Sequence, residues 1–161
     1  MPKGFIPPKS DSGKLAVLSN LLHILHSTTS EKIVLVSNFT STLNVLQNLL
    51  YSKKYSWCRL DGDTDQNKRQ QIVDNFNRVD AKTCCTPWTR KQVLTKVAFL
   101  LSSKSGGCGL NLVGASRLVL FDVDWNPSTD LQSMARIHRD GQTRKVYIYR
   151  FLTYLPQPLQ H

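Results

Sequence analysis

Short, mostly apolar segments alternate along this chain with longer amphipathic segments. The short segments lie at residues 33–36, 56–60, 97–101, 118–121 and 146–149. Before and between the first three of them, apolar residues recur at helical spacing over residues 15–26, 43–50 and 66–76. Strands that are apolar on both faces and alternate with helices are typical of a parallel sheet covered on both sides. The pattern predicts an α/β fold with helices on both faces of a parallel sheet.

The boundaries of the domain follow from where this pattern begins, breaks and ends. We expect a linker at 1–11 and one domain at 12–153. Residues 80–96 have no clear period and carry four basic residues against one acidic residue. They are typical of a long surface loop. Residues 154–161 form a tail whose two prolines disfavour a helix.

The charge of the chain points to a polyanionic partner. The net charge is +10, from 21 basic and 11 acidic residues, and nucleic acid is the common partner of such a chain. The alternative is that a fragment of a larger protein need not be balanced in charge. No apolar run approaches the roughly 20 residues of a membrane helix, and no Cys or His spacing matches a metal site. We expect neither a membrane nor a metal site.

Small polar and glycine residues follow the candidate strand at 97–101. They are Ser102, Ser103, Lys104, Gly106, Gly107 and Gly109. Glycines let a phosphate or ribose approach the backbone closely, and exposed N–H groups favour anions. The lysine precedes the glycines, so this is not a phosphate-binding loop of the Gly-x-x-x-x-Gly-Lys-Ser/Thr type. The alternative is a tight strand-to-helix turn without a ligand.

Two acids and a tryptophan follow the candidate strand at 118–121. Asp122 and Asp124 could suggest acid–base or metal chemistry. The stronger interpretation is that the two acids organise the loop and that Trp125 packs it.

A third polar cluster contains Gln132, Arg136 and Arg139. On a helix, residues three and four apart share a face, so the three side chains would form one stripe. Guanidinium groups bind phosphate oxygens in a fork and can stabilise charge on a transferring phosphoryl group. The alternatives are a solvated basic face, or arginines paired with Asp130 and Asp140.

Taken together, the blocks resemble the carboxyl-terminal helicase-like lobe of the Swi/Snf-type ATPases, in the second helicase superfamily. The similarity covers residues 12–79 and 97–153, and ends in the pattern Gln-x-x-x-Arg-x-x-Arg-x-Gly-Gln at 132–142, which resembles motif VI. The sequence at 102–112 and 139–142 is similar to the homologous-recombination branch of this family. The sequence at 12–15 and 69–74 is similar to the B-type paralogue within that branch. The resemblance implies a single RecA-like lobe and ATP-driven movement along double-stranded DNA.

The resemblance also implies roles for individual residues. Arg136 and Arg139 match the two motif VI arginines that reach across a cleft to the ATP phosphates. Gln132, Gly107 and Gly109 match positions near the nucleotide. The positions that match DNA-facing loops are Ser37, Asn38, Ser102, Ser103 and Lys104. The resemblance further implies a first RecA-like lobe as a partner, and that lobe would make most of the contacts to ATP and Mg²⁺. It also implies a recombinase filament as a partner and the nucleus as the location.

The sequence departs from the family pattern where the first lobe would be. It contains neither the phosphate-binding loop nor the Asp-Glu-x-His type magnesium motif. The resemblance also implies that residues 80–96 are an insertion, because the family connection is shorter there, and that 154–161 is a tail outside the family pattern. Three hypotheses follow. The chain is half of a DNA-stimulated motor that is inactive alone, or a non-enzymatic module that binds DNA or a partner, or a chain that does not fold stably without its other lobe.

Overall fold

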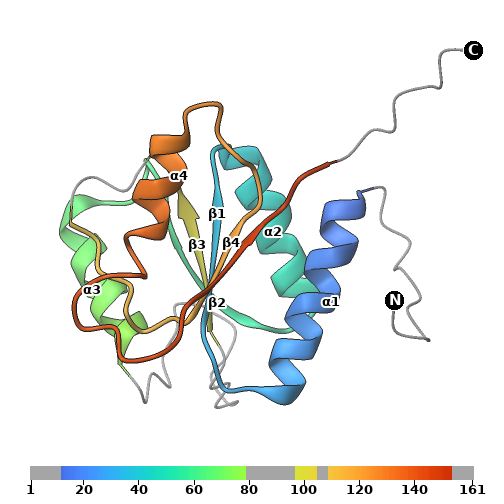
Figure 1. Cartoon of the computed structure of the whole chain (residues 1–161), viewed down its shortest axis with the longest axis horizontal. Coiled ribbons are helices and arrows are strands. Elements are labelled where there is room, and N and C mark those ends of the chain that lie inside the picture. Colours follow the sequence, from blue (N-terminus) through green and yellow to red (C-terminus); the bar gives the residue numbers. More distant parts are fainter. Residues whose placement is uncertain (1–11, 79–96, 105–108, 154–161) are drawn as a thin grey trace, which may run out of the picture.

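Five parallel strands form the sheet of this protein (Figure 1). The computed structural model describes residues 12–78, 97–104 and 109–153. Its elements are α1 (Gly13–Thr28), β1 (Ile33–Ser37), α2 (Thr40–Ser52), β2 (Ser56–Leu60), α3 (Gln66–Asn77), β3 (Val97–Ser102), β4 (Arg117–Leu120), α4 (Pro127–Met134) and β5 (Tyr147–Arg150). The strand order is β2-β3-β1-β4-β5, and each neighbouring pair is parallel. The predicted α/β fold is therefore confirmed.

Three of the predicted segments lie outside the described residues. They are the linker at 1–11, the insertion at 80–96 and the tail at 154–161. The proposed domain boundaries therefore stay predictions. Within the described part of the chain, no helix has both the length and the apolar character needed to cross a bilayer.

The sheet separates two apolar cores. Successive side chains of a strand point to opposite faces, so a strand that is apolar throughout feeds both cores. Val34 of β1 packs in one core with Phe76 of α3. The next residue, Leu35, packs in the other core with Leu22 of α1 and Leu46 of α2. Figure 1 shows the result, with α1 and α2 on one side of the sheet and α3 and α4 on the other.

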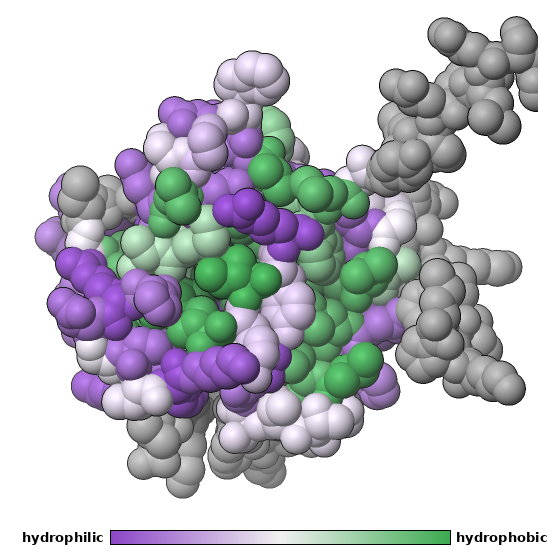
Figure 2. All heavy atoms as spheres, in the orientation of Figure 1, coloured by the Kyte–Doolittle hydropathy of each residue, from purple (hydrophilic) through white to green (hydrophobic). Residues whose placement is uncertain are grey.

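Burial falls off at the two edges of the sheet. The central strand β1 is buried along its whole length, whereas β2 alternates between buried and half-buried residues. β5, at the opposite edge, exposes Tyr147 and Ile148. Figure 2 shows apolar side chains at the surface on either side of β5. Helices lie on both faces of the sheet as predicted, but they leave Tyr147 and Ile148 of β5 exposed.

A close contact joins the end of α3 to the loop before β4. The Asn77 Nδ2 donates to the carbonyl of Asn111 at 2.7 Å, and the Gly114 N–H donates to the Asn77 Oδ1 at 2.9 Å. A Cβ atom added to Gly114 would lie 2.7 Å from the Asn77 Cα. Only glycine therefore allows these two backbones to approach so closely.

Replacing Gly114 with alanine should destabilise the fold, because the new methyl group meets backbone atoms of Phe76 and Asn77 as well as the Asn77 Oδ1. We expect the free energy of unfolding to fall by roughly 1–3 kcal/mol, the usual cost of overpacking. Urea denaturation followed by circular dichroism measures this change. Gly62→Ala is the matched control, because its added Cβ meets nothing within 4 Å. Equal midpoints for the two variants would contradict the contact.

Candidate functional site

The carboxyl ends of β1, β3 and β4 meet in one network of hydrogen bonds. The Ser37 hydroxyl, at the end of β1, donates to the Asp122 Oδ2 after β4 at 2.5 Å. The Ser103 hydroxyl, after β3, donates to the Asn38 Oδ1, and the Ser103 N–H donates to the Ser37 carbonyl at 3.1 Å. Residues predicted from separate stretches of sequence therefore lie together at the edge where ligands of open parallel sheets bind.

Burial divides the five predicted DNA-facing residues into two groups. Ser37, Ser102 and Ser103 are buried, whereas Asn38 is half-buried and Lys104 is exposed. The hydroxyls of Ser37 and Ser103 are engaged in the internal bonds given above. Direct contact with a DNA phosphate is therefore open to Lys104 and Asn38, while Ser37 and Ser103 shape the loops that carry them.

The loop after β4 is organised by its acids. The Asp124 carboxylate accepts from the Asn126 N–H at 3.0 Å, and the Asp124 N–H donates to the buried Asp130 carboxylate at 3.3 Å. With the Ser37–Asp122 bond, these contacts agree with a structural role for the acids. The expected packing role of Trp125 is wrong, because this side chain is 100% exposed. The polar neighbours Asp124 and Asn126 were a sequence signal for this exposure.

The predicted helical stripe of glutamine and arginine is also wrong. Helix α4 begins after the Asn126 cap and ends at Met134, before either arginine. Gln132 and Arg139 are exposed, whereas Arg136 is buried and its Nη2 donates to the Ser103 carbonyl at 3.4 Å. The chain leaves the helix because Ile137 enters the core and the Leu112 N–H holds the Arg136 carbonyl at 2.9 Å. The two arginines therefore point to different environments.

The glycine-rich turn after β3 is described in part. Gly109 is exposed and has a φ of +118°, a conformation that L side chains rarely adopt. Gly107 lies in 105–108, outside the described residues. The structure thus supports a special backbone requirement at Gly109 and leaves the nucleotide role of both glycines as a prediction.

The turn after β2 contributes a further charged group at the same edge of the sheet. Burial raises the pKa of Asp61, but hydrogen bonds from Arg59 and Thr64 outweigh it and hold that pKa below its usual value. Arg59 reaches the Asp61 carboxylate at 2.6 Å and also donates to Asn44 and Gln47 of α2. Asp61 is therefore an ionised, structurally engaged residue of this turn.

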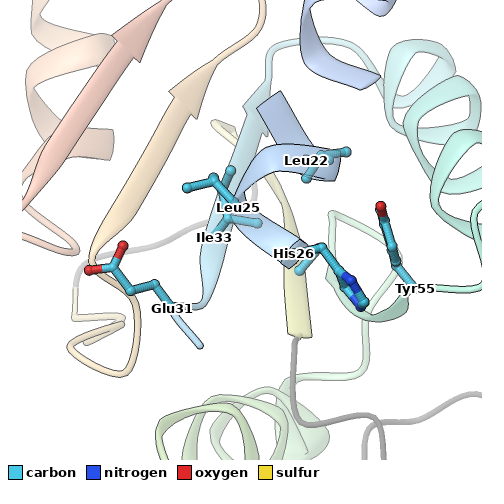
Figure 3. A pocket seen from close by; sticks show the side chains of 7 residues that line it. Leu22, Leu25, His26, Glu31, Ile33 and Tyr55 are labelled. Carbon is cyan, nitrogen blue, oxygen red and sulfur yellow. The ribbon is translucent and has the colours of Figure 1, made fainter. Parts of the chain in front are cut away.

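A small cavity lies at the opposite, amino-terminal edge of the sheet (Figure 3). It is lined by side chains from α1, β1 and β3, and by Tyr55, whose ring stacks on His26 with centroids 4.6 Å apart. Its volume is about 30 Å³, enough for about one water molecule. A cavity of this size is too small for a nucleotide.

The five-stranded parallel sheet with its helices has the fold of a RecA-like lobe. The chain belongs to the helicase conserved C-terminal domain family, whose model matches residues 13–141. It is 51% identical over 146 residues to the human DNA repair and recombination protein RAD54B, covering 90% of this chain and 15% of that protein. It is 52% identical over 143 residues to RDH54 of Saccharomyces cerevisiae strain S288c, a protein of the same description, covering 89% of this chain and 14% of that protein.

A solved structure agrees with these sequence relatives. The crystal structure of the C-terminal part of the Fun30 ATPase domain matches with a TM-score of 0.71 and 36% identity, over 87% of this chain and 41% of that chain. The resemblance to a Swi/Snf-type helicase lobe, nearest in kind to the recombination branch, is thus confirmed. The chain spans about 15% of the length of its human relative.

Proposed function

We propose that this chain is the second RecA-like lobe of an ATP-dependent double-stranded-DNA translocase that acts in homologous recombination and DNA repair. The family match over 13–141 and the similarity to two DNA repair and recombination proteins support this proposal. The observation that carries it is the position of Arg139, whose side chain is exposed on the turn that follows the buried Arg136. The first lobe of the motor, a recombinase filament and a nuclear location belong to the same proposal.

The two arginines do not fit the nucleotide equally well. Among the described residues no ion pair joins Arg139 to Asp140, so its guanidinium is available to a phosphate across a cleft. Bound ATP supplies the phosphoryl group that is transferred, and Arg139 would stabilise the charge that develops on it. Arg136, buried against the Ser103 carbonyl, fits a supporting role.

The magnesium ion is assigned to the first lobe. In the part of the chain that the structure describes, no three His, Cys, Asp or Glu side chains gather in a way that could hold a metal. In this proposal Gln132, which is exposed near the end of α4, would contact the nucleotide from the surface of this lobe. The chain alone is therefore expected to hydrolyse no ATP.

The proposed DNA contact is electrostatic and independent of sequence. Lys104 is exposed directly after the buried Ser103, and Asn38 bonds that serine at the same edge. A net charge of +10 favours a phosphate backbone over base-specific contacts.

A second candidate function is a non-catalytic module that binds DNA or a partner. It is favoured by exposed apolar side chains near the same edge, at Phe39 before α2 and at Trp125 and Leu131 around α4. Surfaces of this kind are common where another protein docks. The first lobe of a motor would satisfy this observation as well, so we place the motor function first.

Duplex binding by the full chain tests the DNA contact. Affinity should fall with rising salt, and Lys104→Ala should reduce the slope of log K against log salt by about 1, because one phosphate contact is lost. Fluorescence anisotropy of a labelled duplex measures this slope. Lys53→Ala, an exposed lysine after the far end of α2, should leave the slope unchanged. No binding at low salt would overturn the DNA role.

A further inference from the structure

The turn that carries Arg139 is tied down on both sides of that residue. Two residues earlier, Ile137 is fully buried in the core. Three residues later, the Gln142 N–H donates to the Arg139 carbonyl at 3.0 Å. Between them Gly141 adopts a φ of +94°, which lets the chain reverse within a few residues. The backbone of Arg139 therefore has a fixed direction.

The side chain of Gln142 is the centre of this arrangement. Its Nε2 donates to the Ala115 carbonyl at 2.7 Å, to the Val113 carbonyl at 3.2 Å and to the Ile137 carbonyl at 3.4 Å. Its Oε1 accepts from the Arg144 N–H at 3.0 Å. One half-buried amide thus joins the two ends of the Arg139 turn to the loop before β4.

The loop to which Gln142 binds is itself held in place. The Gly114 N–H donates to Asn77 at the end of α3, and the Arg144 Nη2 donates to the Gly114 carbonyl at 2.6 Å. The Ser116 carbonyl accepts from the Tyr147 N–H as β4 and β5 begin. Because α3 and the sheet fix the position of this loop, they also fix the position of Gln142, which is hydrogen-bonded to it.

We propose that Gln142 is a positioning residue for Arg139, holding the turn so that the guanidinium faces away from the domain and toward a nucleotide across the cleft. This inference rests on the proposed function of Arg139. Gln142 needs no contact with the nucleotide to act in this way. An amide is suited to the task, because its NH₂ group binds carbonyls while its oxygen accepts a backbone N–H.

Hydrogen exchange on the full chain tests the structural half of the proposal. In Gln142→Ala the amides of residues 136–142 should exchange about tenfold faster, the effect of losing about one hydrogen bond. Gln142→Glu keeps the shape but replaces the donor by a carboxylate, and should do the same. The amides of β1 and β3 serve as internal references. Gln70→Ala, which removes an exposed glutamine bonded to Asp74, is the matched control. Unchanged exchange at 136–142 in both Gln142 variants would overturn the proposal.

A double-mutant cycle tests the functional half. We would place this chain in the aligned 146-residue segment of human RAD54B and measure ATP hydrolysis with duplex DNA. Gln142→Ala should lower kcat about tenfold or more with little change in KM. If Gln142 acts through Arg139, then Gln142→Ala added to Arg139→Ala should cause little further loss.

The outcomes separate the two proposals. Losses that simply multiply in the double variant would show that Gln142 acts independently of Arg139, and would overturn the positioning role. Full activity in Arg139→Ala would instead overturn the proposed function, and with it the catalytic meaning of the turn. The exchange experiment would still decide whether Gln142 fixes the turn, because it requires no activity.

Discussion

Replacing Arg139 with alanine is expected to lower kcat for ATP hydrolysis by roughly 10³–10⁵-fold in a protein that joins this chain to a first RecA-like lobe. In the proposed motor, the exposed guanidinium would supply charge and a forked pair of donors where negative charge develops on the phosphoryl group. Steady-state release of phosphate, with duplex DNA and magnesium present, measures the effect. The first lobe can come from human RAD54B, with this chain in place of the aligned segment.

Three controls define this result. Arg139→Lys keeps the charge but loses the fork, and should recover only part of the activity. Arg150→Ala removes another exposed arginine, on β5, and should leave hydrolysis unchanged. The chain without a first lobe should show no turnover. Wild-type kcat in Arg139→Ala, or hydrolysis that follows the chain alone through purification, would contradict the proposal.

Replacing Arg136 with alanine should destabilise the domain rather than remove a phosphate contact alone. The side chain is 7% exposed, and its guanidinium bonds the Ser103 carbonyl at the end of β3. Losing a buried charged donor should lower the free energy of unfolding by about 2 kcal/mol, which corresponds to a fall in Tm of roughly 4–8 °C for a domain of this size.

Thermal unfolding followed by circular dichroism separates the two arginines. Arg139→Ala, on the exposed turn, should keep the wild-type Tm, whereas Arg136→Ala should not. Arg136→Lys should lie between them, since it restores the charge without the planar fork. Equal Tm values for wild type and Arg136→Ala would show that the buried guanidinium contributes nothing to stability.

The interior of the sheet could be predicted from the sequence because burial on both faces leaves a simple signature. β1 reads Ile-Val-Leu-Val-Ser and is buried throughout, so composition alone identifies it. β5 reads Tyr-Ile-Tyr-Arg and was also predicted as a strand, yet its Tyr147 and Ile148 are exposed at the edge of the sheet. The order of strands in a sheet is set by contacts between distant segments, which local periodicity does not report.

The gathering of candidate residues at one edge of the sheet could be predicted from the sequence, but their detailed geometry could not. Gathering Ser37 and Ser103 at one edge follows from parallel topology. The end of α4 at Met134 could not be predicted, because the polar residues up to Arg139 keep helical spacing and residues 128–139 contain no glycine or proline. Tertiary contacts end the helix, namely burial of Ile137 and the bond from Leu112 to Arg136. Trp125 was predicted to pack but is exposed, because no neighbouring residues that the structure describes form a pocket for its ring.

The position of β1 at the centre of the sheet has a consequence for synthesis. Ile33 pairs with Ala98 on one side and with Arg117 on the other, although β1 is the first strand of the chain. During synthesis, β1 therefore stays unpaired until most of the domain has emerged from the ribosome. Pairing between strands that are distant in sequence slows folding, and it leaves unpaired, apolar strand edges exposed until folding is complete. We expect nascent chains that stop before β3 to depend on chaperones, and chains that extend past β5 to be released from them.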